Sequence, residues 1–382
     1  MQQVAVLGAT GSIGRNSADV LSVNRDRYHA SVLAANRNIG ELSRQAALLS
    51  AGEVITASEE LLPELRRMAP PGTVCRSGIP AMVEAVQRQD VDIVLCAIIG
   101  TAGIAPVLAA LAAGKKVALA SKEVLVLAGE LVMRAAKNSP GGSIVPVDSE
   151  HSGVFQSLAG RRREELARVW LTASGGPFRE WDAERIRTAS LADALAHPTW
   201  KMGRKITVDS ASMMNKALEL IEARYLFDLA PEQLRAVINP QSVVHALVEL
   251  TDGSMIAQMS VPDMRLAIAY GLSYPERLTR PGSRLDLAAL RKLDFYEPDP
   301  VKFPSLEFAQ AALHAGGTLP AVMNAANEVA VERFCAGEIA FGGIWRIVGE
   351  VMESWRVEPQ ESLEQLLAVD AEARIRAREC RG

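Results

Sequence analysis

The stretch VAVLGATGSIG, residues 4–14, decides the fold of the first part of this chain. An apolar run leads into a glycine-rich turn, and the residues after the turn have the pattern of a helix. Glycines let the backbone approach a pyrophosphate, and the N-terminus of the next helix offers N–H groups and a positive dipole. An ordinary tight turn is the alternative. The position directly after an N-terminal strand favours a dinucleotide-binding turn.

Outward from this stretch, apolar runs alternate with helical patterns. Strands are expected at 4–7, 31–35, 53–56, 93–97, 117–119 and 143–147. This alternation predicts an α/β fold, with a Rossmann-like doubly wound parallel sheet over residues 1–147. Residues 93–114 carry no charge and are long enough to span a bilayer, but two glycines and Pro106 interrupt them. We therefore expect a buried strand, a turn and a short helix there.

The rest of the chain has a different pattern. Residues 148–273 predict a central α+β domain, with strands near 168–173, 236–239, 243–250 and 254–259 and helices near 150–158, 212–226 and 262–272. Residues 274–299 are proline-containing with little periodicity, which indicates a linker. Residues 300–382 predict a C-terminal helical bundle.

Composition excludes several functional classes. The 382 residues include 41 Lys and Arg against 45 Asp and Glu, a net charge of −4, which argues against nucleic-acid or anionic-membrane binding. The four cysteines lack metal or redox spacing and predict reduced thiols in a cytoplasmic protein. An apolar run begins almost at once, so we expect no targeting segment.

The end of the second predicted strand bears on cofactor choice. An NAD site usually places an acid there to hold the ribose 2′-hydroxyl. Here the sequence reads Ala34-Ala35-Asn36-Arg37-Asn38, with no acid, and Arg37 suits a 2′-phosphate. NADPH is therefore favoured, with a solvated arginine as the alternative.

Three carboxylates predict a metal site. Asp148 and Glu150 follow the strand at 143–147, and in extended chain they would point the same way. Glu219 from a later helix completes the set. All-oxygen ligation suits one divalent cation, Mg²⁺ or Mn²⁺, and not zinc. Helix N-capping is the alternative for the first two.

Residues 197–219 combine groups for phosphate and for metal. On a helix, Asn215 and Lys216 lie on the same side as Glu219. A cation for phosphate and a carboxylate for metal would then be neighbours. Ser174, at the end of another strand, precedes a glycine turn whose N–H groups could hold an anion, although a plain β-turn is the alternative.

Residues 175–204 contain few strong elements and predict a lid that closes over substrate. Trp200, a large apolar side chain in a charged segment, is expected to contact substrate on closure. His197 is a candidate polar contact. For His245, in mid-strand, we expect a structural hydrogen bond, and for His151 a supporting role beside the metal ligands.

Together these residues resemble the 1-deoxy-D-xylulose 5-phosphate reductoisomerase family. The resemblance covers nearly the whole chain. It rests on the segments Gly8–Gly14, Ala120–Glu123, Pro146–Ser152, Thr172–Phe178, His197–Ala223, Pro240–Ser242 and Asn324–Glu328.

The resemblance implies an enzyme that rearranges 1-deoxy-D-xylulose 5-phosphate with a metal and reduces the product with NADPH, giving 2-C-methyl-D-erythritol 4-phosphate for isoprenoid synthesis. It implies a homodimer, with residues 148–273 as the catalytic and dimerisation domain. The implied metal ligands are Asp148, Glu150 and Glu219, and Lys122 joins them as a catalytic residue. Implied substrate contacts are Lys122, Ser149, Glu150, Ser174, His197, Trp200, Ser210, Asn215, Lys216 and Glu219. Implied cofactor contacts are Thr10, Gly11, Ser12, Ile13, Asn36, Arg37, Asn38, Ser121, Glu123 and Gly203.

Three positions depart from the family pattern. Ser121 replaces the usual Asn, Asn36 the usual Gly, and Asn239 a frequent His. Two other functions stay open from the residues alone. A metal-independent NADP dehydrogenase would not need the three carboxylates. An NADPH-sensing regulator would keep the glycine turn and could lose the ligand set.

Overall fold

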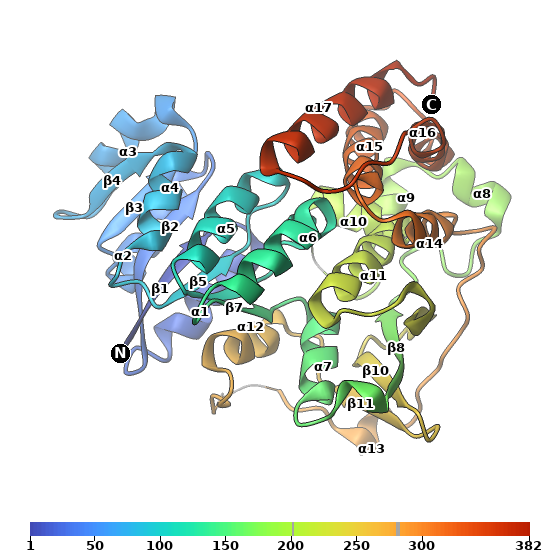
Figure 1. Cartoon of the computed structure of the whole chain (residues 1–382), viewed down its shortest axis with the longest axis horizontal. Helices are drawn as coiled ribbons and strands as arrows, with labels where there is room; N and C mark the ends of the chain where they lie inside the picture. The colour runs from blue at the N-terminus through green and yellow to red at the C-terminus, as the bar shows by residue number, and fades with distance from the viewer. Residues whose placement is uncertain (201, 280–282) are drawn as a thin grey trace. The chain divides into compact units, whose positions relative to one another are not determined.

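The computed structural model describes residues 1–200, 202–279 and 283–382 (Figure 1). Lys201 of the predicted lid and residues 280–282 of the predicted linker lie outside the described residues. The chain divides into two compact units. The first comprises Met1–Val124, Val132–Ser152 and Asp263–Pro281, and the second Leu125–Leu131, Gly153–Pro262 and Gly282–Gly382.

The first unit is built on a seven-stranded sheet in the order β4-β3-β2-β1-β5-β6-β7. All its pairings are parallel. The strands are β1 (Gln2–Leu7), β2 (Tyr28–Ala35), β3 (Glu53–Thr56), β4 (Val74–Ser77), β5 (Ile93–Cys96), β6 (Lys116–Leu119) and β7 (Ser143–Pro146). Strand order reverses at β1, which lies between β2 and β5, so ligands are expected at its carboxyl end.

Helices connect these parallel strands. They are α1 (Ser12–Ser22), α2 (Ile39–Leu49), α3 (Leu62–Met68), α4 (Gly78–Gln87), α5 (Ile104–Ala112) and α6 (Lys122–Asn138), with short turns η1 (Glu59–Leu61) and η2 (Thr101–Gly103). The predicted doubly wound sheet is confirmed, and residues 93–114 form β5, η2 and α5 as expected. Within residues 1–200, 202–279 and 283–382, no helix combines the length and apolar character needed to cross a membrane.

The second unit contains a four-stranded mixed sheet in the order β11-β10-β8-β9. Its strands are β8 (Leu166–Ala173), β9 (Leu234–Ile238), β10 (Val244–Leu250) and β11 (Met255–Met259). β8 and β9 are parallel, and the other pairings are antiparallel. The helices and short turns between β7 and the C-terminal helices, apart from α12, are α7 (Ser149–Leu158), η3 (Arg163–Glu165), α8 (Ala183–Arg187), α9 (Leu191–Leu195), α10 (Arg204–Ala211), α11 (Met214–Phe227), η4 (Pro231–Gln233) and α13 (Leu287–Leu290).

The predicted C-terminal helices are present and belong to the second unit. They are α14 (Ser305–Ala315), α15 (Leu319–Cys335), α16 (Phe341–Glu353) and α17 (Leu363–Glu379), drawn orange to red in Figure 1. α15 packs against both α16 and α17, and α14 packs against α11. The predicted catalytic and helical domains therefore form one compact unit, because α11 and the C-terminal helices share buried side chains.

One helix lies in a different unit from the one predicted. Helix α12 (Met264–Ser273) closes the central domain in the sequence-based division, but it packs on α1, β6 and β7 of the first unit. Gly271 permits this close approach: a Cβ there would lie 2.9 Å from the Val147 side chain. Apolar periodicity shows that a helix is amphipathic, but not which sheet it covers.

Candidate active site

The glycine turn after β1 has the shape needed for a nucleotide. Gly8 has a φ of +89°, and a Cβ on it would lie 2.4 Å from the carbonyl oxygen of Ala97. A Cβ on Gly14 would lie 2.1 Å from the carbonyl oxygen of Ala9. Only glycine fits at both positions, so the turn between β1 and α1 packs tightly on neighbouring backbone at the point where strand order reverses, and it leaves Gly11 and Ser12 exposed.

The residues after β2 form hydrogen bonds and an ion pair with neighbouring segments. The side chain of Asn38 caps α2 by accepting the N–H of Glu41 at 3.2 Å. The backbone carbonyl of Asn36 accepts the Thr56 hydroxyl at 2.6 Å. Exposed Arg37 pairs with Glu60 at 2.6 Å, and this contact holds the pKa of the Glu60 carboxyl below its usual range. Arg37 is therefore neither buried nor simply solvated.

Lys122 and Asp148 lie together in the first unit. Each follows a strand, β6 or β7, and these strands are neighbours in the sheet. The Lys122 ammonium lies 2.7 Å from the Asp148 carboxylate, and Lys122 is buried. The ends of adjacent parallel strands meet at one edge, which explains why residues so far apart in sequence form this pair.

The predicted extended geometry of Asp148 and Glu150 is wrong, because α7 begins at Ser149 and Glu150 occupies its first turn. Asp148 accepts the N–H of Ser149 at 3.0 Å, and Ser149 donates its hydroxyl to Glu150 at 2.5 Å. Both carboxylates therefore lie at a helix N-terminus, where backbone dipoles favour negative charge.

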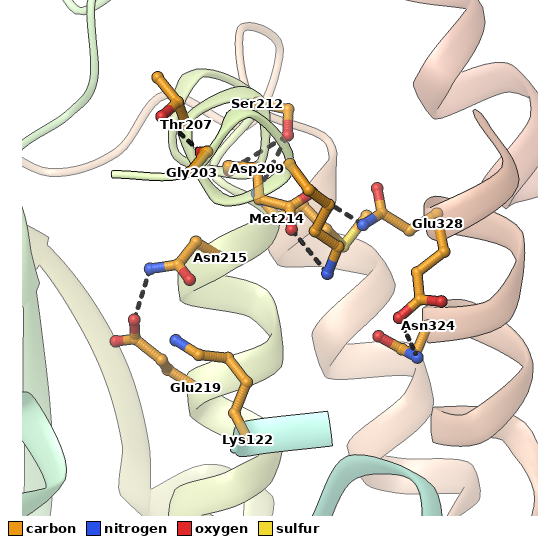
Figure 2. A network of polar contacts seen from close by, with 12 residues as sticks. Lys122, Gly203, Thr207, Asp209, Ser212, Met214, Asn215, Glu219, Asn324 and Glu328 are labelled. Atoms are coloured by element: carbon orange, nitrogen blue, oxygen red, sulfur yellow. Dashed lines mark hydrogen bonds and ion pairs between the residues drawn. The ribbon is translucent and has the colours of Figure 1, made fainter. Parts of the chain in front are cut away.

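Helix α11 brings together the residues predicted from the 197–219 stretch. Asn215 donates its amide to Glu219 at 2.5 Å (Figure 2). Lys216 forms an ion pair with the same carboxylate. Lys216 is 2% exposed and Glu219 is 1% exposed. Charged residues are seldom buried without a functional or pairing reason. The predicted convergence on one helix side is confirmed.

Three further predicted residues meet in the second unit. His197 places its Nε2 atom 3.1 Å from the hydroxyl oxygens of both Ser174 and Ser210. Ser174 follows β8, and Ser210 lies near the end of α10. Gly176 has a φ of +63°, and a Cβ there would lie 2.8 Å from the Ser210 carbonyl oxygen. The glycine turn after β8 therefore lies directly against α10.

Hydrogen bonds define the tautomer of His197. The backbone N–H groups of Thr199 and Trp200 donate to Nδ1, at 3.1 and 2.9 Å. Nε2 therefore carries the proton of the neutral ring and donates it toward the serines. Burial lowers the pKa of His197 below its ordinary value of 6.5. The imidazole is a neutral donor at pH 7.

We expect nuclear magnetic resonance to report the Nε2–H tautomer and a His197 pKa below 6.5 in the free protein. The folded state favours the neutral ring, so stability contributed by His197 is present above pH 6.5 and is lost as pH falls from there toward the lowered pKa.

Inorganic phosphate should raise the His197 pKa, because an adjacent anion favours the imidazolium. An unchanged His197 titration in saturating phosphate would contradict a contact between His197 and the substrate phosphate.

The segment predicted as a lid has more structure than expected. α8 and α9 occupy part of it, and Phe178 is fully buried, with its ring centroid 5.0 Å from that of Phe341. Ile186 is also fully buried. These anchors hold residues 175–195 on the C-terminal helices. The expectation of few strong elements agrees with the two five-residue helices α8 and α9, and the described residues 196–200 and 202–203 contain no helix or strand.

The other two histidines considered in the sequence, His245 and His151, are buried. His245 lies in β10 and contacts the Ser260 hydroxyl at 2.9 Å through Nε2, which is a structural bond within the sheet. His151 is on the first turns of α7. Sequence reasoning gave no role to two other buried polar residues, Asp209 and Asn327. Their only signal is a polar side chain inside an otherwise apolar helical pattern.

Comparison with known proteins decides the family. Three family models match successive parts of the chain: 1-deoxy-D-xylulose 5-phosphate reductoisomerase at residues 4–129, its C-terminal domain at 144–227, and the DXP reductoisomerase C-terminal domain at 259–376. A reductoisomerase from Geotalea uraniireducens is 44% identical over 100% of this chain and 99% of its own length. One from a Bradyrhizobium species is 47% identical over 98% of this chain and 93% of its own length. This chain belongs to the 1-deoxy-D-xylulose 5-phosphate reductoisomerase family.

Solved structures of the family agree. The reductoisomerase from Zymomonas mobilis in complex with NADPH has a TM-score of 0.92 and 42% identity, covering 98% of each chain. A reductoisomerase in complex with NADPH, fosmidomycin and magnesium has a TM-score of 0.94 and 37% identity, covering 99% of this chain and 98% of the other. The mixed α/β fold is thus that of the family.

The structure accounts for all three departures from the family pattern. Ser121 donates its hydroxyl to the Ile98 carbonyl at 2.5 Å, which leaves only acceptor capacity for a cofactor. Asn239 is fully buried, and its amide donates to Gln241 at 2.9 Å and to the Asp294 carbonyl at 3.0 Å. That position supports the loop after β9. Asn36 is not among the non-glycine residues of the described chain with positive φ, so it replaces glycine without backbone strain.

Proposed function

We propose that this chain converts 1-deoxy-D-xylulose 5-phosphate to 2-C-methyl-D-erythritol 4-phosphate by a metal-dependent rearrangement followed by reduction with NADPH. The observation that carries the proposal is the full-length similarity to relatives named for this reaction, 44% identical over 100% of the chain. The buried cluster of Asn215, Lys216 and Glu219 supports it. Lys216 offers a positive charge for the substrate phosphate, and Glu219 beside it offers a carboxylate for the metal.

NADPH is proposed to bind at the glycine turn. Glycine at positions 8 and 14 lets the turn pack tightly on its own backbone, and Gly11 and Ser12 at the start of α1 are exposed, which supports binding of a dinucleotide there. The residues proposed to contact the cofactor are Thr10, Gly11, Ser12, Ile13, Asn36, Arg37, Asn38, Ser121, Glu123 and Gly203. Ile13 packs its side chain on the core of the first unit, so its contact would come from the backbone.

One divalent cation, Mg²⁺ or Mn²⁺, is proposed to be held by Asp148, Glu150 and Glu219. Carboxylate oxygens fit these cations. When bound, the cation supplies polarisation of the substrate carbonyl and stabilises negative charge on its oxygens. Asp148 pairs with Lys122, and Glu219 pairs with Lys216. A cation that neutralises the carboxylates would weaken these pairs, leaving both ammonium groups available to substrate oxygens.

The substrate phosphate is proposed to bind Ser174, His197, Ser210, Asn215 and Lys216. Neutral His197 and the two serine hydroxyls supply donors, and Lys216 supplies the positive charge. Ser149, Glu150 and Lys122 are proposed to contact the reacting end of the substrate. The proposed lid is the part of residues 175–204 without buried anchors, of which residues 196–200 and 202–203 are described, and Trp200 would exclude water on closure.

We further propose that the protein acts as a homodimer in the cytoplasm. Large apolar side chains are exposed within a short part of the second unit, which supports a second copy covering them: Leu287 is 66%, Tyr296 52% and Val301 65% exposed. No observation favours the metal-independent dehydrogenase or the regulator over the reductoisomerase.

The experiment that tests the function follows NADPH absorbance with 1-deoxy-D-xylulose 5-phosphate, with and without Mg²⁺ or Mn²⁺. Oxidation should require substrate and metal together, and the product should be the branched polyol phosphate. Oxidation that continues in excess chelator would instead support the metal-independent dehydrogenase. Binding of NADPH without any turnover would support the regulator.

Cofactor choice is expected to depend on Arg37. Arg37→Ala should weaken NADPH binding by about tenfold, the loss of a charge-assisted hydrogen bond, and leave NADH binding nearly unchanged. Glu60→Gln is the matched control, since it releases Arg37 from its partner and should not weaken NADPH binding. Dissociation constants from fluorescence titration measure both. Equal use of the two cofactors by the unmutated protein would refute the assignment.

A further inference from the structure

The corner between α10 and α11 has an unusual backbone. Two residues, Ser212 and Met213, join the helices, and Met213 has a φ of +61°. A left-handed conformation is unfavourable for a residue with a side chain, so surrounding contacts must hold it. Met213 is 2% exposed and packs on Ile238 and Phe303. We call residues 209–214 the corner.

Two buried hydrogen bonds from the C-terminal helices hold the corner. On α15, Asn327 donates its amide to the Asp209 carboxylate at 2.8 Å. On α14, Ser305 donates its hydroxyl to the Ser212 carbonyl at 2.9 Å. These four residues are each at most 1% exposed. Each contact therefore forms in a dry environment, where its loss leaves a partner unsatisfied.

Further contacts support both bonds. Lys205, one turn before Asp209, pairs with it at 2.9 Å. The indole N–H of Trp345 on α16 donates to the Ser305 hydroxyl at 2.9 Å and orients it. Inside the corner, Ser212 accepts the N–H of Met214 through its hydroxyl at 3.3 Å. Three C-terminal helices thus contribute to one short segment.

Proposed phosphate ligands lie on both sides of the turn at Ser212 and Met213. Ser210, just before this turn, contacts His197 at 3.1 Å. Asn215 and Lys216 begin α11 immediately after it. A rotation at the corner would change the distance between the Ser210 hydroxyl and the Lys216 ammonium, although neither Asn327 nor Ser305 belongs to the proposed binding set.

We propose that Asn327 and Ser305 are positioning residues for phosphate recognition: they hold the corner so that Ser210, Asn215 and Lys216 face one phosphate group. This inference rests on the proposed function, since it concerns the same phosphate site. It assigns the C-terminal helices a role in substrate recognition that requires no contact with the substrate.

The test compares kcat/KM for 1-deoxy-D-xylulose 5-phosphate with that for unphosphorylated 1-deoxy-D-xylulose. Asn327→Ala should lower kcat/KM for the phosphorylated substrate by about tenfold or more and that for the unphosphorylated one by less than about threefold. Ser305→Ala should act in the same direction. Asn324→Ala is the matched control. Asn324 is equally buried on the same helix, but it donates to Glu328 at 3.3 Å and not to the corner.

A double variant in which Asn327 and Asp209 exchange side chains tests whether the preference for the phosphorylated substrate can be restored. Asn327→Asp alone places a second carboxylate against Asp209 and should lose the preference for phosphate. Combination with Asp209→Asn restores one amide and one carboxylate and should recover the preference. This double variant also keeps the test informative if Asn327→Ala does not fold, which circular dichroism would report.

The possible outcomes separate the two proposals. If the unmutated enzyme shows no preference for the phosphorylated substrate, the proposed phosphate site is wrong. If it shows the preference and Asn327→Ala retains it, or if Asn327→Ala and Asn324→Ala both lower the two rates equally, the positioning role is overturned. A selective loss in Asn327→Ala, recovered by the exchange, supports it.

Discussion

Glu219→Gln should reduce turnover by about a thousandfold or more and leave NADPH binding intact. The substitution keeps the shape of the side chain but removes the negative charge that a divalent cation requires, and metal stabilisation of a reacting oxygen contributes several kcal/mol. The glycine turn of the cofactor site is built by the first unit alone, so it should be unaffected. Steady-state rates and an NADPH titration measure the two effects.

Glu328→Gln is the matched control for this prediction. Glu328 also pairs with a basic side chain, Arg374, within the second unit, but it is not a proposed metal ligand. Its substitution should lower thermal stability and preserve metal-dependent turnover. Binding of Mn²⁺, followed by electron paramagnetic resonance, should weaken in Glu219→Gln only. Full activity of Glu219→Gln, or of the unmutated enzyme in chelator, would rule out the metal assignment.

Lys216→Ala should lower kcat/KM for the phosphorylated substrate by about a hundredfold, the upper part of the range for a buried charge-assisted contact. The unphosphorylated substrate should lose much less, because it never makes this contact. Turnover should fall together with affinity, since binding energy at the remote phosphate organises the reacting end. Rates with both substrates, in wild type and variant, measure the effect.

Lys216 has a second neighbour that the comparison must separate. It pairs with Glu219, so its removal also leaves that carboxylate without its lysine. If Lys216 acted mainly through Glu219, both substrates would lose rate equally and metal affinity would change. Equal losses would therefore show that Lys216 is not a phosphate ligand. Ser174→Ala and Ser210→Ala remove neutral hydrogen-bond donors. Each should also lower kcat/KM mainly for the phosphorylated substrate, but by a smaller factor than Lys216→Ala.

Most strands of the first unit could be predicted because buried parallel strands are continuous apolar runs. β4 could not, because it is a short edge strand whose residues are exposed or half-buried, and Arg76 within it pairs with Glu53 and Glu84. An edge strand has no apolar run to recognise. The anchoring of residues 175–195 was missed for a similar reason, since single side chains such as Phe178 carry it.

In the candidate site, the sequence predicted what a local pattern can encode. The convergence of Asn215, Lys216 and Glu219 follows from helical spacing, and the glycine turn follows from its place after a strand. The orientation of Asp148 and Glu150 did not follow, because the choice between extended chain and helix at Ser149 depends on what α7 packs against. Arg37 was a candidate by position, but its pairing with Glu60 required the structure.

The sequence by itself determined the family, the order of most strands and helices, and the chemical groups available for cofactor, metal and phosphate. These properties depend on neighbours along the chain, through apolar periodicity, turn residues and motif spacing. Only the tertiary structure decided that α12 covers the first sheet, that His197 contacts Ser174 and Ser210, and that Asn327 reaches Asp209 across 118 residues. Such contacts depend on how separate elements pack, and packing is a property of side-chain shape in three dimensions that no local pattern records.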